Sequence, residues 1–266
     1  MRIDLKTSII EALAVKAGDL VSIVGAGGKT SLMYGLGHEL VAAGEPALLT
    51  TTTRIWSPDR RQVPRVVLGP ETEATAGRIA GGIRESGSVL AALEESDSKL
   101  KGFSPEFVEE LYNSCRRWTV VAECDGAMGK SLKVPRDHEP PMAPSTSVLV
   151  VLVGVDCLGR SLSDDLIFRP SDVGEVTGRS PDATVDEDLV AEAVLSKRSY
   201  LGRKPPGARM CVLLNKVDPQ VLNGTPGKAG GGVTLDLALK LKQSAAVERV
   251  CLGSMKDPGR RFLVVR

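Results

Sequence analysis

A strand-like run that passes directly into a glycine-rich turn and then a helix is the feature that most restricts how this chain can fold. Residues 20–24 (LVSIV) predict a short buried strand, and residues 25–31 (GAGGKTS) follow it without a break. Leu32, Leu36 and Leu40 then recur at helical spacing. A strand, a glycine-rich turn and a helix in this order are the structural context of a loop that binds phosphate groups.

The turn is two residues shorter than the common phosphate-binding pattern G-x-x-x-x-G-K-S/T, because Ile23 stands where the first glycine is expected. Similar short loops occur in ATP-dependent Mur-type ligases, so the shortness does not exclude a nucleotide. We expect Lys29 to reach phosphate oxygens and the Thr30 hydroxyl to ligate Mg²⁺. Backbone N–H groups at a helix start attract anions. The predicted phosphate-binding residues are Gly25, Ala26, Gly27, Gly28, Lys29, Thr30 and Ser31. The alternative is a strand-to-helix turn in which the Lys-Thr pair is incidental.

The rest of the chain repeats this alternation of apolar runs and helical patterns. Continuous apolar runs predict strands covered on both faces, and they occupy residues 47–51, 119–122, 147–153, 210–214 and 249–252. Helical patterns occupy residues 71–85, about 104–115 and 234–246. The sequence therefore predicts an α/β, P-loop NTPase-like fold with a mostly parallel central sheet and helices on both faces. We expect residues 1–266 to form a single domain, with an insertion or cap at about 159–207, where Pro, Asp, Gly and Ser are frequent.

Two acidic residues follow the predicted strand at residues 119–122. In P-loop proteins a carboxylate at the end of a neighbouring strand holds Mg²⁺, directly or through water. Glu123 and Asp125 are two residues apart, so we expect one to face the metal and the other to shape the turn before Gly126. With Lys29 they are the predicted catalytic residues, and with Thr30 they are the predicted metal ligands. The alternative is a surface turn after a strand.

A further strand end carries a motif that indicates which base is bound. Residues 215–218 (NKVD) follow the apolar run 210–214 and resemble the N-K-x-D motif with which GTPases recognise guanine. Asp218 would accept hydrogen bonds from the ring N–H and the exocyclic amine of guanine, and adenine offers no such pair of donors. Lys216 would cover the base with its aliphatic stem, and Asn215 would brace the loop. The motif favours GTP over ATP, and the alternative is a polar turn closed by Pro219.

Residues 50–53 (TTTT) and Arg54 follow the second predicted strand. Hydroxyl groups at the carboxyl end of a strand suit a ligand crevice, so Thr52 and Arg54 are candidates for contacting a second substrate. A run of threonines is equally good β-strand sequence, and an arginine after it is equally a surface residue.

Three groups of segments occur in the order found in one protein family. They are VSIVGAGGKTSLMYGLGHEL with LLTTTTRIWSP, then VVAECDGAMGKSLKVPRDHEP, then GVDCLGRSL followed by RP and LLNKVD. On these residues the chain, from about Val21 to Asp218, resembles the YqeC family, described as accessory proteins for selenium-dependent molybdenum hydroxylases or selenium cofactor biosynthesis proteins. The resemblance implies a nucleotide-binding protein that acts in maturation of such an enzyme. Its partner would be the molybdenum hydroxylase or a cofactor precursor.

The same resemblance implies a second-substrate pocket around residues 133–139. Its candidate residues are Lys133, Asp137, His138 and Glu139. His138 is a candidate acid, base or ligand, and the alternative is a surface histidine in a Pro-rich loop. The sequence departs from the family pattern at Phe168, where a histidine is expected in relatives, so this chain cannot use a histidine side chain there.

The overall composition argues against several classes of partner. Lys and Arg number 34 and Asp and Glu number 33, and this balance favours neither nucleic acid nor a membrane surface. Aromatic residues make up only 3%, too few for the stacking platform of a single-strand binder. No run reaches the roughly 18 apolar residues of a membrane span. The five scattered cysteines predict neither disulfides nor a zinc site, and the N-terminus lacks a signal-peptide pattern, so we expect a cytoplasmic protein.

These patterns together predict a Mg²⁺-dependent nucleoside triphosphatase or phosphotransferase. It would bind GTP or ATP and act as an accessory protein in maturation of a selenium-dependent molybdenum hydroxylase or its cofactor. One alternative is a small-molecule kinase or a Mur-like ATP-dependent ligase, with its acceptor near residues 133–139. A second alternative is a nucleotide-gated chaperone that binds the nucleotide but barely hydrolyses it.

Overall fold

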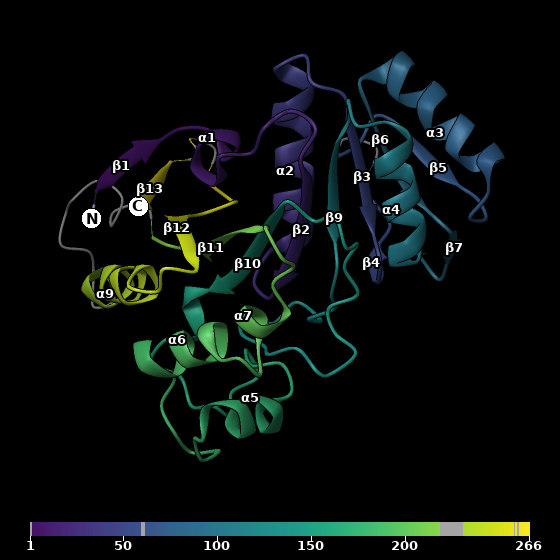
Figure 1. Cartoon of the computed structure of the whole chain (residues 1–266). Helices are drawn as coiled ribbons and strands as arrows, with labels where there is room; N and C mark the ends of the chain where they lie inside the picture. Colours follow the sequence, from purple (N-terminus) through teal and green to yellow (C-terminus); the bar gives the residue numbers. More distant parts are fainter. Residues whose placement is uncertain (1, 60–61, 219–230, 258, 260) are drawn as a thin grey trace.

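A mostly parallel β-sheet runs through the centre of the molecule. The computed structural model describes residues 2–59, 62–218, 231–257, 259 and 261–266. The strands of the sheet are β1 (Ile3–Lys6), β2 (Leu20–Gly25), β3 (Ala47–Thr51), β5 (Val66–Leu68), β6 (Ser88–Ala92), β9 (Thr119–Glu123), β10 (Val148–Gly154), β11 (Arg209–Asn215), β12 (Val247–Gly253) and β13 (Phe262–Val265). Within the described residues they pair in the order β1-β13-β12-β11-β10-β2-β9-β3-β6-β5 (Figure 1).

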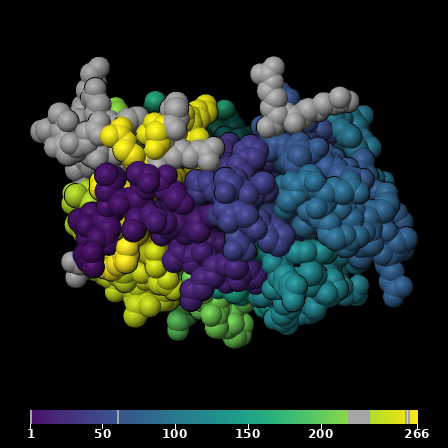
Figure 2. Space-filling model, turned by 90° about the horizontal axis from the view of Figure 1, so that it is seen from above, coloured from purple at the N-terminus to yellow at the C-terminus, as the bar shows by residue number. Residues whose placement is uncertain are grey.

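The central strands are buried on both faces, as the continuous apolar runs predict. Every residue of β2, β3, β9 and β10 is buried. From β12 to β5 the neighbouring strands pair in parallel, whereas β13 is antiparallel to both β12 and β1. The two ends of the chain therefore meet at one edge of the sheet, where Figure 2 shows purple N-terminal and yellow C-terminal residues side by side. The predicted α/β fold with a mostly parallel sheet is confirmed and is consistent with a P-loop NTPase-like fold.

Helices cover both faces of the sheet, which also confirms the prediction. They are α1 (Ile9–Leu13), α2 (Lys29–Ala42), α3 (Glu73–Ser86), α4 (Pro105–Ser114), α5 (Pro170–Thr177), α6 (Glu187–Leu195), α7 (Tyr200–Arg203) and α9 (Gly231–Lys242). On one face, α1 and α2 pack against the sheet. On the other face, α3 and α4 cover the part near β3 and β6, and α6 and α9 cover the part near β10, β11 and β12.

The segment 159–207, which the sequence suggests as an insertion or cap, contains α5, α6 and α7. In this segment α6 lies against the central sheet rather than away from it (Figure 1). Leu189 and Val190 of α6 are fully buried in one apolar cluster with Val212 and Leu214 of β11. The segment therefore supplies one of the helices that cover the sheet between the parallel strands β10 and β11.

A second, small sheet stands beside the main one. Its strands are β4 (Arg54–Trp56), β7 (Glu94–Ser96) and β8 (Lys99–Lys101), paired in the order β4-β8-β7. Ile55 and Leu100 are opposite each other in the β4–β8 pair and are buried at 4% and 1% exposure, which anchors this sheet to the core. No sequence pattern predicts these three-residue strands.

The carboxyl ends of β2, β9, β10 and β11 lie together because these strands are parallel neighbours. In open α/β sheets this edge is where ligands bind, at the point where the chain changes direction across the sheet. The residues that follow these strands form the candidate site. None of the helices in the described part of the chain is long and apolar enough to cross a membrane.

We predict that Leu189→Ala lowers the free energy of unfolding by about 2–5 kcal/mol, because it leaves a cavity between α6 and the sheet. Leu213→Ala in β11, also fully buried, should give a loss in the same range. Chemical denaturation followed by far-UV circular dichroism would measure both. The control is Glu192→Ala in the same helix, whose loose ion pair with Arg179 is exposed, with an expected change within about 0.5 kcal/mol. A separate early transition confined to Leu189→Ala would contradict this packing.

Candidate functional site

The glycine loop, defined as residues 25–28, joins β2 to α2. Gly25, Gly27 and Gly28 have φ angles of 93°, 95° and 124°, which side-chain-bearing residues rarely adopt. A Cβ on Gly25 would lie 2.2 Å from the Leu152 carbonyl oxygen, and one on Gly27 would lie 2.5 Å from the Gly154 nitrogen. The glycines are thus required by close packing of the loop against β10, a reason that adds to the expected approach of phosphates.

The first turn of α2 is open to an anion. Its N-cap is Gly28, and no side chain caps the N–H groups of this turn in the described chain. The first N–H groups of a helix have no partner inside the helix and carry partial positive charge. The loop and the start of α2 therefore offer N–H donors of the kind that bind phosphate.

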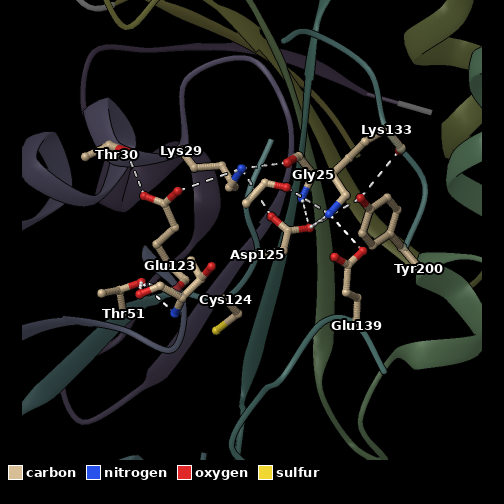
Figure 3. A network of polar contacts seen from close by, with 12 residues as sticks. Gly25, Lys29, Thr30, Thr51, Glu123, Cys124, Asp125, Lys133, Glu139 and Tyr200 are labelled. Carbon is tan, nitrogen blue, oxygen red and sulfur yellow. Dashed lines mark hydrogen bonds and ion pairs between the residues drawn. The ribbon is translucent and has the colours of Figure 1, made fainter. Parts of the chain in front are cut away.

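Lys29 points toward two carboxylates at the end of β9 (Figure 3). Its Nζ donates to the Gly25 carbonyl oxygen at 2.7 Å and lies 3.1 Å from Asp125 Oδ1 and 3.8 Å from Glu123 Oε1. The Lys29 side chain is only 4% exposed. The ammonium group is held by these carboxylates in the structure, within reach of the loop that the sequence predicts to bind phosphate.

Asp125 is shared by two buried lysines. Its Oδ2 accepts a hydrogen bond from the Gly25 N–H at 3.0 Å and lies 3.3 Å from Lys133 Nζ, whose side chain is fully buried (Figure 3). The Tyr200 hydroxyl donates to the same oxygen at 3.5 Å. Burial raises the pKa of Tyr200 far above its ordinary value, so its hydroxyl stays protonated as a donor.

The network continues to Glu139. Lys133 Nζ lies 3.1 Å from Glu139 Oε2, and Arg169 Nη1 lies 3.3 Å from Glu139 Oε1. Burial alone would raise the pKa of Glu139, but Lys133, the Arg136 N–H and Arg169 together hold it below its ordinary value. Glu139 is therefore an ionised counter-charge for Lys133, so cations and carboxylates alternate from Lys29 to Arg169.

Glu123 occupies a different position from Asp125. Its Oε2 accepts a hydrogen bond from the Thr30 hydroxyl at 2.7 Å, and it lines the pocket in front of the loop, which Asp125 does not. Burial is the main reason that the pKa of Glu123 is raised, and Lys29 and Thr30 offset only part of that effect. Of the two acids, Glu123 is the one that faces the pocket, and Asp125 fixes the loop.

This pocket, called here the loop pocket, has a volume of about 500 Å³. The glycine loop and the first turn of α2 form one wall, residues 126–130 form another, and β4 with Lys99 of β8 forms the third. Its charged lining residues are Lys29, Arg54, Lys99, Lys130 and Glu123. An excess of cations over carboxylates favours an anionic ligand.

The motif at residues 215–218 lies at the other side of the loop. The Asn215 side chain donates to the Gly27 carbonyl oxygen at 2.6 Å and accepts from the Met255 N–H at 2.9 Å, so it braces the loop as expected. Lys216 Nζ donates to Ser131 Oγ and to Asp156 Oδ2, both at 2.7 Å. Asp218 is exposed at the end of the described segment. The structure places the motif next to the loop, and its role in base recognition stays a prediction.

Comparison with known proteins gives two sequence matches. The family model described as YqeC protein matches residues 21–171, which include the glycine loop, both acids and every network residue except Tyr200. The Escherichia coli (strain K12) protein named "Uncharacterized protein YqeC" is 30% identical over 265 residues, which cover 98% of each chain. The chain belongs to the YqeC family. The resemblance stated from the sequence motifs is thereby confirmed.

In this YqeC-family chain, the six candidate second-substrate residues fall in separate places. Arg54 lines the loop pocket, whereas the Thr52 hydroxyl donates to the Pro141 carbonyl oxygen at 2.7 Å. Lys133 and Glu139 belong to the buried network. Asp137 and His138 are exposed at a second pocket of about 490 Å³, which is also lined by Arg136, Lys197, Arg198 and Arg203. The structure does not bring the six together, and their roles stay predictions.

Phe168, the departure from the family pattern, packs against the same network. Lys133 Nζ lies 5.6 Å from the centre of its ring, and the Arg169 guanidinium lies 4.6 Å from it. Both distances suit a cation–π contact. The aromatic ring thus stabilises two cations that also pair with Glu139.

Several residues of the site carry no signal in the sequence. Tyr200 and Arg169 come from the segment 159–207, and Ser131 and Trp56 lie inside segments that carry the family resemblance, where nothing in the residues marks them as site residues. Residues this far apart in sequence can be linked only by the fold. An arginine before a proline and an aromatic residue before a run of polar residues are too common to single out.

We predict that Glu123→Gln stabilises the protein at pH 7 and that the gain disappears on acidification. Burial raises the pKa of Glu123 above its ordinary value of 4.5. A carboxyl group with a raised pKa adds its full share to the free energy of unfolding below pH 4.5, and this share is lost as the pH rises through the raised value. A glutamine, which stays neutral, therefore stabilises the protein most above that value. The measurement is the difference in unfolding free energy between variant and wild type from pH 4.5 to pH 7.5.

Glu109 provides a control of opposite sign. Burial raises its pKa, but two hydrogen bonds from Ser145 and further contacts hold the pKa below its ordinary value. Glu109→Gln should therefore destabilise the protein at pH 7, with a loss that shrinks only as the pH falls below about 4.5, so this variant is also measured at lower pH. A Glu123→Gln difference that is constant across this pH range would contradict the assignment of a raised pKa.

Proposed function

We propose that this protein binds a nucleoside triphosphate with Mg²⁺ at the glycine loop, favouring GTP over ATP. We further propose that it uses hydrolysis or phosphoryl transfer in maturation of a selenium-dependent molybdenum hydroxylase or its cofactor. The observation that supports nucleotide binding best is the convergence of Lys29, Thr30 and Glu123 at the open end of α2 in one pocket. The maturation role follows from the family resemblance, since members are described in those terms.

Phosphate binding rests on two kinds of donor. The N–H groups of Gly27, Gly28 and the first turn of α2 would hold phosphate oxygens, because a helix start favours negative charge there. The Gly25 and Ala26 N–H groups already donate to Asp125 and to the Leu152 carbonyl oxygen. Lys29 would exchange its contacts with Asp125 and Glu123 for contacts with phosphate oxygens, which lie within reach of a flexible four-carbon side chain. Asp125 would keep Lys133 and the Gly25 N–H as partners, so the loop would stay in place.

The donors beside the loop fit a magnesium ion. The Thr30 hydroxyl and the Glu123 carboxylate are oxygen ligands within 2.7 Å of each other, and both line the pocket. Mg²⁺ prefers oxygen ligands and is usually held by one or two carboxylates together with substrate phosphates and water. When bound, it would neutralise charge on the phosphate oxygens. Thr30 and Glu123 are the residues that would hold it.

Transfer of a phosphoryl group to a small molecule is the second candidate, as in a kinase or a Mur-like ligase. One observation favours it: the loop pocket continues beyond Thr30 and Glu123 to the small sheet at Arg54 and Trp56. That space exceeds what the phosphates alone would use. Product analysis separates the candidates, because a phosphorylated or condensed small molecule supports this one and free phosphate supports hydrolysis.

We predict that Lys29→Ala weakens binding of GTP or ATP at least tenfold, about 1.4 kcal/mol, because it removes the cation that contacts the phosphates. Isothermal titration calorimetry with a non-hydrolysable analogue and Mg²⁺ would measure it. The control is Lys16→Ala, an exposed lysine before the opposite end of β2, which should leave the affinity unchanged. Unchanged affinity of a folded Lys29→Ala variant, checked by its thermal unfolding, would refute the proposal.

We predict that the wild-type protein binds GTP more tightly than ATP. Asp218→Asn should lower the ratio of the GTP affinity to the ATP affinity at least tenfold. The physical reason is that an asparagine cannot accept both guanine donors as a carboxylate does. The two affinities are compared in wild type and variant under one condition of salt and Mg²⁺. Equal affinities for GTP and ATP in the wild type would refute the guanine assignment while leaving phosphate binding intact.

A further inference from the structure

The part of the loop pocket that the small sheet lines consists of Arg54, Ile55, Trp56 and Lys99, and Arg54, Trp56 and Lys99 are here called the small-sheet end. Arg54 and Trp56 are two apart on β4 and both exposed, while Ile55 between them is buried in the core. Side chains two apart on a strand point to the same face. Trp56 is paired with Lys99 across the two strands, so all three are fixed on one rigid element.

The two cations of this end lack carboxylate partners within the described residues. Within the described residues the Arg54 guanidinium makes no ion pair or hydrogen bond, and Lys99 Nζ makes no ion pair but lies 4.5 Å from the centre of the Trp56 ring. By contrast, Lys101 on the same strand pairs with Glu94 at 3.2 Å, and Lys130 on the facing wall pairs with Asp165. Two unpaired cations in one pocket indicate a place for a negatively charged group.

The apolar surface of this end is also unusual. Trp56 is 67% exposed, and Met128 on the opposite wall is 82% exposed. A large side chain that presents apolar surface inside a pocket commonly contacts a ligand, and an indole ring offers a face on which a planar ring can stack. Aromatic residues are scarce in this chain, only 3%, so an exposed tryptophan in a pocket is not explained by composition.

We infer that the small-sheet end binds a second ligand, a planar heteroaromatic molecule that carries a phosphate or carboxylate group. Its ring stacks on Trp56, and its anionic group pairs with Arg54 and Lys99. The inference rests on the proposed function, since it assigns the glycine loop to the nucleotide and the remaining space to this ligand. A molecule in this position lies in the same pocket as Thr30 and Glu123, where the terminal phosphate of the nucleotide is proposed to lie.

The position of Asn215 argues that Trp56 does not stack on the base of the nucleotide itself. Asn215 braces the loop from β11, on the side of β2 where β10 and β11 lie. The small sheet follows β3, on the opposite side of β2 beyond β9. If the base lies beside Asn215–Asp218 as proposed, the small-sheet end is left for another molecule.

The test uses flavin mononucleotide (FMN) as a planar probe with a phosphate, in a Trp118→Phe background so that Trp56 is the single tryptophan. FMN should quench Trp56 fluorescence, and it should bind equally well with a saturating non-hydrolysable GTP analogue and Mg²⁺ present. Riboflavin lacks the phosphate and ribose 5-phosphate lacks the ring, and each should bind at least tenfold more weakly than FMN.

Variants assign the binding to the named residues. By flavin fluorescence, Trp56→Ala and the double variant Arg54→Ala/Lys99→Ala should each weaken FMN at least tenfold. Trp56→Phe should stay within about threefold, because a phenyl ring still stacks. Lys101→Ala, the matched lysine on the same strand, should leave FMN binding unchanged. All four should keep the affinity for the GTP analogue within twofold.

Three results would overturn the inference: no binding of FMN, FMN binding that survives loss of Arg54 and Lys99, or competition between FMN and the nucleotide analogue. A fourth result would also overturn the inference: if Trp56→Ala weakened the binding of FMN and of the GTP analogue equally, the Trp56 ring would be assigned to stacking on the nucleotide base. Failure of the proposed function gives a different pattern. In that case Lys29→Ala would not change nucleotide affinity, while FMN binding alone still reports on Trp56.

Discussion

One buried carboxylate, that of Asp125, holds the site together. It accepts a hydrogen bond from the first N–H of the glycine loop and pairs with two lysines whose side chains are 4% and 0% exposed. Burying an ammonium group is strongly unfavourable unless a counter-charge lies close to it. Lys29, Lys133 and the loop therefore depend on the same acid, and the end of β9 fixes the end of β2 through it. Removing the acid would take a counter-charge from two buried lysines at once, so the positions of Lys29, Lys133 and the loop depend on one another.

The glycine loop shows how a short loop between a strand and a helix can be held rigid. Packing against β10 at Leu152 and Gly154 excludes a Cβ on Gly25 and Gly27. A Cβ on Gly28 would lie only 2.4 Å from the Asn215 amide nitrogen, so it is excluded as well. Longer loops can wrap around phosphates with their own backbone. This one is shaped from outside, by neighbouring strands and the Asn215 side chain, so its N–H groups are held in position before any ligand arrives.

The sequence predicted the parts of the fold that rest on local patterns. The strands β2, β3, β9, β10, β11 and β12, the helix α2 and the N-terminal cap of α4 follow from apolar runs, leucine spacing and Ser104-Pro105, and the structure has them within a few residues. The buried strand β6 was not predicted. The strands β4, β7 and β8 could not be predicted, because three residues carry no periodicity. In the site, Lys29, Thr30 and Glu123 were identified by motif and strand end. Tyr200 and Trp56 were not, since only the fold relates them to the loop.

The candidate second-substrate residues show that neighbours in sequence can also be separated by the fold. Lys133, Asp137, His138 and Glu139 are close in sequence, and the family resemblance implied a single pocket for them. The structure divides them, because the chain turns after Pro135 and sends Lys133 into the core while His138 stays exposed. One segment rich in charged residues therefore contributes both to the buried network of ion pairs and to a surface pocket. The sequence pattern does not show which residue belongs to which.

The charge balance around Lys29 has a consequence for how ligands would bind. In the structure Lys29 is compensated by Asp125 and Glu123, so a triphosphate that draws Lys29 away leaves Glu123 without its cation. Glu123 is buried, and an uncompensated buried carboxylate is unfavourable. A divalent cation that arrived with the phosphates would restore the balance of charge, whereas the triphosphate alone would leave the Glu123 carboxylate unpaired. Under the proposed function the two binding events would be coupled through this single carboxylate. In the protein without ligands, burial already raises the pKa of Glu123.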